Sequence, residues 1–128
     1  MNIEHLAIWT GDLERLKAFY VKYFGAEAGE KYRNAATGFE SYFLSFASGS
    51  RLELMSSPDL AGALPAGKRA GLAHFAVAAG TKNEVTALTD LLRRDGFTIA
   101  SAPRTTGDGY FESQILDPDG NQIEIAAG

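Results

Sequence analysis

The chain has no cysteine, only two histidines and a single tryptophan among its 128 residues. Without cysteine, neither a disulfide bond nor a thiolate metal site is possible. Basic residues are also scarce, because sixteen acids outnumber twelve lysines and arginines, and the net charge is −4. This balance argues against a nucleic-acid or membrane-surface protein, since both need a basic footprint. No apolar run is long enough to cross a bilayer.

The remaining composition is that of an ordinary globular protein, with 45% hydrophobic and 22% charged residues. A chain of this length fits one domain and can bury a core without covalent staples. The first residues show neither a basic region nor a long apolar stretch, so no signal peptide is expected. A cytoplasmic location is the default prediction.

Two halves of the chain show the same order of predicted elements. Hydrophobic periodicity and turn residues predict a strand, a helix and three strands in each half. In the first module, 1–55, the strands are 3–9, 28–32, 39–47 and 51–55, and the helix runs from Asp12 to Gly25. In the second module, 71–128, the strands are 72–78, 97–100, 110–116 and 122–126, and the helix runs from a capping box at Thr81 to Gly96. A linker, 56–70, joins the modules, and the prediction is a single α+β domain of two tandem βαβββ modules.

One histidine and one glutamate occupy equivalent places in each half. His5 precedes Glu53 by 48 positions and His74 precedes Glu124 by 50, and these are the only histidines. The flanking residues match as well: His-Leu-Ala-Ile resembles His-Phe-Ala-Val, and Leu-Glu-Leu resembles Ile-Glu-Ile. Such a repeat predicts that the two halves assemble a metal site from two histidines and two glutamates.

Strand geometry supports this prediction, because side chains alternate between the two faces of a sheet. The leucines around Glu53 and the isoleucines around Glu124 are expected to face the core, which turns both carboxylates toward the histidine face. A carboxylate among aliphatic neighbours is costly unless it is compensated, and a divalent cation compensates it. Imidazole and carboxylate ligands suit Zn, Ni, Co, Fe or Mn.

Each feature taken alone has a plainer interpretation. A lone histidine in an apolar strand is usually a hydrogen-bonded core residue, and an alternating Leu-Glu-Leu run is usually an exposed strand face. The agreement of all four positions in a duplicated frame favours the metal site.

The chain resembles the vicinal oxygen chelate superfamily, which includes glyoxalase I, extradiol dioxygenases and bleomycin resistance proteins. The most specific stretch is 107–125, where the turn Asp-Pro-Asp-Gly-Asn leads into the Glu124 strand; the His5 strand and the Ala-Phe-Tyr of the first helix resemble the usual beginning. The resemblance implies paired βαβββ modules around a metal-binding cleft, and a homodimer. It places His5, Glu53, His74 and Glu124 on the ligand positions of glyoxalase I.

The resemblance also implies a reaction and a cofactor. A divalent metal, with zinc the expected ion, would bind two neighbouring oxygens of a small substrate and stabilise the charge formed by proton abstraction beside a carbonyl. The resemblance assigns the base to Glu124 and a second catalytic carboxylate to Glu53, as in a lyase or isomerase. Two other classes stay open: a non-catalytic binder of the bleomycin-resistance type, and an Fe(II) ring-cleaving dioxygenase.

Two positions depart from glyoxalase I. Trp9 stands where bacterial members have an arginine that grips a glutathione carboxylate, and Ser57 stands where they have an asparagine that helps hold glutathione. An indole cannot replace a bidentate guanidinium, so lactoylglutathione lyase activity itself is not expected. Arg51 and Arg104 are candidate anchors for an anionic substrate, or simply solvated surface charges.

Overall fold

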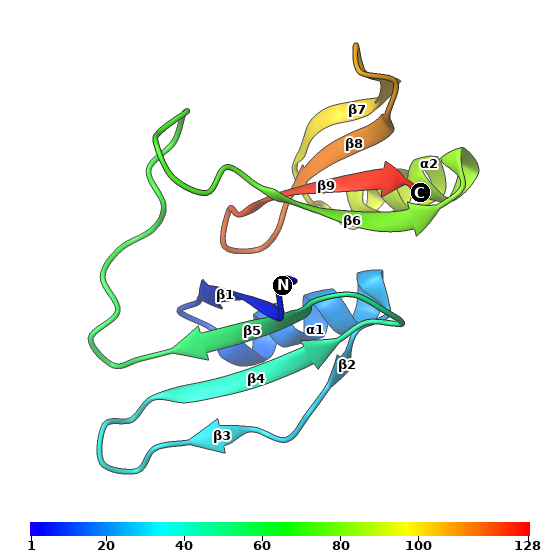
Figure 1. The fold of residues 1–128 in the computed structure, drawn as a ribbon. Coiled ribbons are helices and arrows are strands. Elements are labelled where there is room, and N and C mark those ends of the chain that lie inside the picture. Colours follow the sequence, from blue (N-terminus) through cyan, green and yellow to red (C-terminus); the bar gives the residue numbers. More distant parts are fainter. The chain divides into compact units, whose positions relative to one another are not determined.

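The computed structural model describes all residues, 1–128, which form two compact units, Met1–Gly62 and Ala63–Gly128 (Figure 1). The first unit contains β1 (His5–Trp9), α1 (Leu13–Phe24), β2 (Glu27–Ala28), β3 (Tyr32–Arg33), β4 (Glu40–Ser45) and β5 (Arg51–Ser56). The second contains β6 (Phe75–Gly80), α2 (Lys82–Arg94), β7 (Ile99–Thr105), β8 (Phe111–Leu116) and β9 (Gln122–Ala127). No helix has the length and apolar character needed to cross a membrane.

Each unit contains its own β-sheet. In the first, the strand order is β1-β5-β4-β2, with β3 also paired to β4; in the second it is β6-β9-β8-β7. The first strand of each unit pairs in parallel with the last, and the other pairs are antiparallel. The predicted α+β class is therefore confirmed, and each predicted module forms its own hydrogen-bonded sheet.

A helix covers one face of each sheet, and the aliphatic residues of the last strand pack against it (Figure 1). Leu52 and Leu54 on β5, and Ile123 and Ile125 on β9, are at most 2% exposed. The partly buried Glu53 and Glu124 alternate with them and so belong to the opposite face. Burying these aliphatic residues thus fixes which way the two carboxylates point.

The helix ends follow the predicted chemistry. The carboxylate of Asp12 accepts a hydrogen bond from the backbone N–H of Arg15, and Gly25 ends α1 in a left-handed conformation at φ 63°. Both hydrogen bonds of the predicted capping box are present at α2, where Thr81 and Glu84 exchange them. The hydrogen bond from the Thr81 backbone lowers the pKa of Glu84.

Three predicted strands differ clearly from the structure. In place of the strand 97–100, the longer β7 runs from Ile99 to Thr105. The run 28–32 forms two separate two-residue strands, β2 and β3, each paired with β4. The strand 72–78 begins later, at Phe75, so His74 lies just before β6. The ladder with β9 starts at Phe75 opposite Ile123.

A buried pair of hydroxyls joins α2 to β8. Thr89 Oγ1 lies 2.7 Å from Ser113 Oγ and also donates to the carbonyl of Val85, and both hydroxyl-bearing residues are fully buried. We expect Thr89→Val to lower the free energy of unfolding by about 1–3 kcal/mol, because it leaves Ser113 unsatisfied. Urea unfolding checks this. The double variant Thr89→Val/Ser113→Ala should recover part of the loss, and a double variant that is additively worse would contradict the pairing.

Candidate functional site

In the first unit, His5 and Glu53 face the same side of the sheet. Strands β1 and β5 are in register with Ala7 beside Glu53 and His5 beside Arg51. His5 Nε2 lies 3.8 Å from Glu53 Oε1, and the Glu53 side chain is only 15% exposed. The small side chain of Ala7 leaves this part of the sheet face open beside the carboxylate.

The second unit repeats the arrangement. Ala76 on β6 is the register partner of Glu124 on β9. His74 Nε2 lies 3.1 Å from Glu124 Oε2, and the Glu124 side chain is 12% exposed. The structure thus brings each predicted histidine to its own glutamate. Within either unit these ligands form a pair, and no group of three or more metal-binding side chains is present.

The geometry within each pair was compared with that of two ligands on one cation. Metal bonds of about 2.0–2.2 Å at angles between 90° and the tetrahedral value place neighbouring ligand atoms roughly 2.9–3.4 Å apart. The 3.1 Å distance between His74 and Glu124 falls inside this range. The 3.8 Å distance between His5 and Glu53 requires the two groups to close by a few tenths of an ångström. Imidazole nitrogen and carboxylate oxygen are suitable ligands for a divalent transition metal.

Additional groups support the histidine of the first unit. The Glu4 carboxylate lies 2.5 Å from His5 Nδ1 and also accepts hydrogen bonds from Arg51, one of them from Nε at 2.8 Å. These hydrogen bonds, the one with His5 first, lower the pKa of Glu4. The Arg51 guanidinium stacks over the Phe43 ring at 4.2 Å, and the His5 ring meets Phe43 edge-on at 5.3 Å.

In the second unit, the glutamate has the additional support. Gln114 is the register partner of Glu124 and donates from Nε2 to Glu124 Oε1 at 2.9 Å. Gln122 in turn donates to Gln114 Oε1 at 2.7 Å. One oxygen of Glu124 is therefore held by an amide while the other faces His74. Burial raises the pKa of the neighbouring Glu112, and the charge of Glu124 adds to the effect.

The turn before β9 sets this register. Asp117 is buried, and its carboxylate accepts from the backbone N–H groups of Asp119 and Asn121. Gly120 supplies the positive φ of 85° that the turn needs. The predicted turn is thus present, and it fixes Glu124 opposite Gln114.

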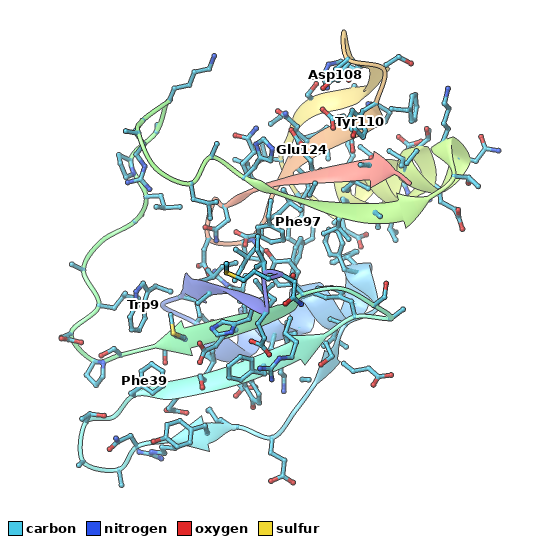
Figure 2. The ribbon with its side chains drawn as sticks, in the orientation of Figure 1. Trp9, Phe39, Phe97, Asp108, Tyr110 and Glu124 are labelled. Carbon is cyan, nitrogen blue, oxygen red and sulfur yellow. The ribbon has the colours of Figure 1, made fainter.

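An aromatic cluster lies on the same side of the first sheet as His5. Trp9 is 51% exposed, and its ring meets Phe39 edge-on at 6.1 Å (Figure 2). Tyr32 also contacts Phe39 at 6.1 Å and is 55% exposed. Ser57 Oγ donates to Asp59. At the two positions that depart from glyoxalase I, Trp9 therefore presents an exposed indole, and the Ser57 hydroxyl is hydrogen-bonded to Asp59.

Sequence reasoning missed Glu4 and Gln114. Glu4 directly precedes His5, and neighbours along a strand are expected to point to opposite faces. Glu4 reaches His5 only because it lies just before β1. Gln114 could have been found from its place in the strand that pairs with the Glu124 strand. Arg51, a candidate anion anchor or surface charge, donates a hydrogen bond to Glu4.

Comparisons with known proteins bear on the fold. The glyoxalase/bleomycin resistance protein/dioxygenase superfamily model matches residues 2–125. A domain of that description from Frankia sp. EAN1pec is 16% identical with a TM-score of 0.85, and the match covers 100% of this chain and 98% of that one. A glyoxalase family protein from Enterococcus faecalis is 24% identical with a TM-score of 0.78, covering 98% and 96%.

The chain spans 44% of the length of a Zea mays glyoxalase I mutant, which is 24% identical over 99% of this chain with a TM-score of 0.82. The search of curated proteins gives no match. At these identities the structural similarity shows the fold. Since the family model extends over nearly all of the sequence, the chain belongs to the glyoxalase/bleomycin resistance protein/dioxygenase superfamily.

Proposed function

We propose that the protein is a metal-dependent lyase or isomerase, in which His5, Glu53, His74 and Glu124 bind one divalent cation. A single observation carries the proposal: each half presents one imidazole Nε2 beside one mostly buried carboxylate, at 3.8 Å and at 3.1 Å. A buried carboxylate needs a compensating positive charge. Zinc is the proposed ion, with Ni, Co, Fe and Mn as alternatives.

When bound, the cation would act as a Lewis acid for a substrate with two neighbouring oxygens. Glu124 would take the proton next to the substrate carbonyl, and Glu53 would be the second carboxylate on the opposite side. Gln114 keeps hold of Glu124 Oε1, so that the carboxylate stays oriented when its other oxygen accepts the proton.

The substrate we propose is a small hydroxy-carbonyl compound without a carboxylate at the Trp9 position. Trp9 and Phe39 offer ring edges and faces there rather than a guanidinium. We therefore do not assign glutathione adducts as substrates. We further propose a homodimer and a cytoplasmic location, as the sequence predicts.

The half-exposed aromatic cluster of Trp9, Phe39 and Tyr32 favours a second candidate, a binding protein that sequesters an aromatic ligand without chemistry. Metal analysis separates the two functions. Protein purified without chelator and dialysed against zinc should retain one zinc per chain and should exchange the α-proton of hydroxy-carbonyl compounds in D2O, as followed by NMR. Stoichiometric ligand binding without metal or exchange would favour the sequestering protein and contradict our proposal.

A further inference from the structure

The two histidines differ in what surrounds their second ring nitrogen. Glu4 lies 2.5 Å from His5 Nδ1, whereas the residue before His74 is Ala73, which has no side-chain acceptor. The two halves therefore have the same proposed ligand types, but they differ in the group that contacts Nδ1 of the histidine.

The Glu4 carboxylate is itself held in place. Arg51 donates to Glu4 Oε1 from two nitrogens, which leaves Oε2 for His5. The backbone N–H of Arg51 also donates to the Glu4 carbonyl at 3.0 Å. Phe43 packs against both the guanidinium and the imidazole. Arg51, Glu4 and His5 thus form a connected chain of side chains over one aromatic ring.

We propose that Glu4 is a positioning residue that fixes His5 as the Nδ1–H tautomer and so turns the unprotonated Nε2 toward Glu53 and the metal. A neutral imidazole has one N–H and one lone pair, and a carboxylate at Nδ1 can only accept. The proton of the neutral ring therefore resides on Nδ1. A carboxylate behind a ligand histidine also increases its basicity and fixes its orientation.

His74 provides an internal comparison. Its Nε2 lies 3.1 Å from Glu124 Oε2, and the residue before it, Ala73, offers no carboxylate to Nδ1. Without metal, the carboxylate favours a proton on Nε2 of His74, which is the opposite tautomer. The first half-site is thus prepared for a cation before binding, whereas in the second the ring proton must first move from Nε2 to Nδ1.

The first measurement uses the metal-free protein. The nitrogen chemical shifts of ¹⁵N-histidine-labelled protein, recorded at alkaline pH where imidazoles are neutral, report the tautomer of each ring. We expect the Nδ1–H form for His5 in the wild type and a shift toward Nε2–H in Glu4→Ala, with His74 unchanged. Glu30→Ala is the matched control, because Glu30 is an exposed carboxylate of the same unit; it should leave His5 unchanged. A wild-type His5 in the Nε2–H form, or a tautomer that Glu4→Ala does not alter, would overturn the proposal.

The second measurement is zinc affinity by competition with a chelator, and it rests on the proposed function. We expect Glu4→Ala to weaken zinc binding about 10–100-fold, with Glu4→Gln between it and the wild type because its amide oxygen still accepts. Thermal unfolding shows whether each variant is folded. Wild-type protein that binds no zinc but shows the Glu4-dependent tautomer would reject the metal function and retain the role of Glu4. Equal zinc affinity and equal tautomers in wild type and Glu4→Ala would reject the role of Glu4 and retain the metal function.

Discussion

Replacing Glu124 with glutamine is expected to reduce proton exchange on a hydroxy-carbonyl substrate by about 10²–10⁴-fold, the usual contribution of a general base. The amide keeps the size of the carboxylate and one oxygen ligand, but it cannot accept the substrate proton at neutral pH. Metal content should fall much less than turnover. The measurement is the NMR rate of α-proton exchange in D2O, together with the zinc content of the same samples.

Asp90→Asn is the matched control for this variant. It makes the same change from carboxylate to amide on α2, where Asp90 is exposed and pairs with Arg93. Exchange by Asp90→Asn should match the wild type. Full activity in Glu124→Gln with metal still bound would show that Glu124 is not the base.

Replacing either histidine with alanine is expected to abolish tight metal binding, with affinity falling by more than about 100-fold. This exceeds the effect of supporting residues because a direct ligand is lost. The informative feature is that His5→Ala should release the cation although the pair of His74 and Glu124 is untouched. That follows only if both pairs hold the same ion. The double variant His5→Ala/His74→Ala should bind zinc no more tightly than either single variant.

Isothermal titration with zinc measures these affinities, and circular dichroism checks that each variant is folded. Both histidines are about 40% exposed or less on the open face of their sheet, so their loss should leave the cores intact. A His5→Ala protein that still binds one zinc tightly through the second unit would contradict a shared ion.

Much of the fold followed from the sequence because local signals agreed with packing. The capping residues Asp12 and Thr81, the stop at Gly25 and the turn at Gly120 are each determined by local backbone chemistry, and all are present. The alternation around Glu53 and Glu124 correctly indicated the face of each carboxylate. Strand limits were less predictable, since they depend on pairing with a strand distant in the sequence; β6 begins at Phe75, where its ladder with β9 starts.

The surroundings of the ligands were harder to predict, because they depend on strand register. Gln114 reaches Glu124 only because the turn at Asp117 places the two opposite each other. In the first unit, the same register position opposite Glu53 is Phe43. The repeat in the sequence therefore predicted four equivalent ligands but not that an amide supports one carboxylate and a ring lies beside the other.

The most direct test of the central claim is a titration with Co²⁺, followed by X-ray absorption spectroscopy of the bound ion. If two imidazoles and two carboxylates meet at one cation, the chain binds one cobalt, and each cobalt has two imidazole ligands, whether the two pairs come from one chain or from two. Binding of two ions per chain with one imidazole each, or no stoichiometric binding, would contradict the account.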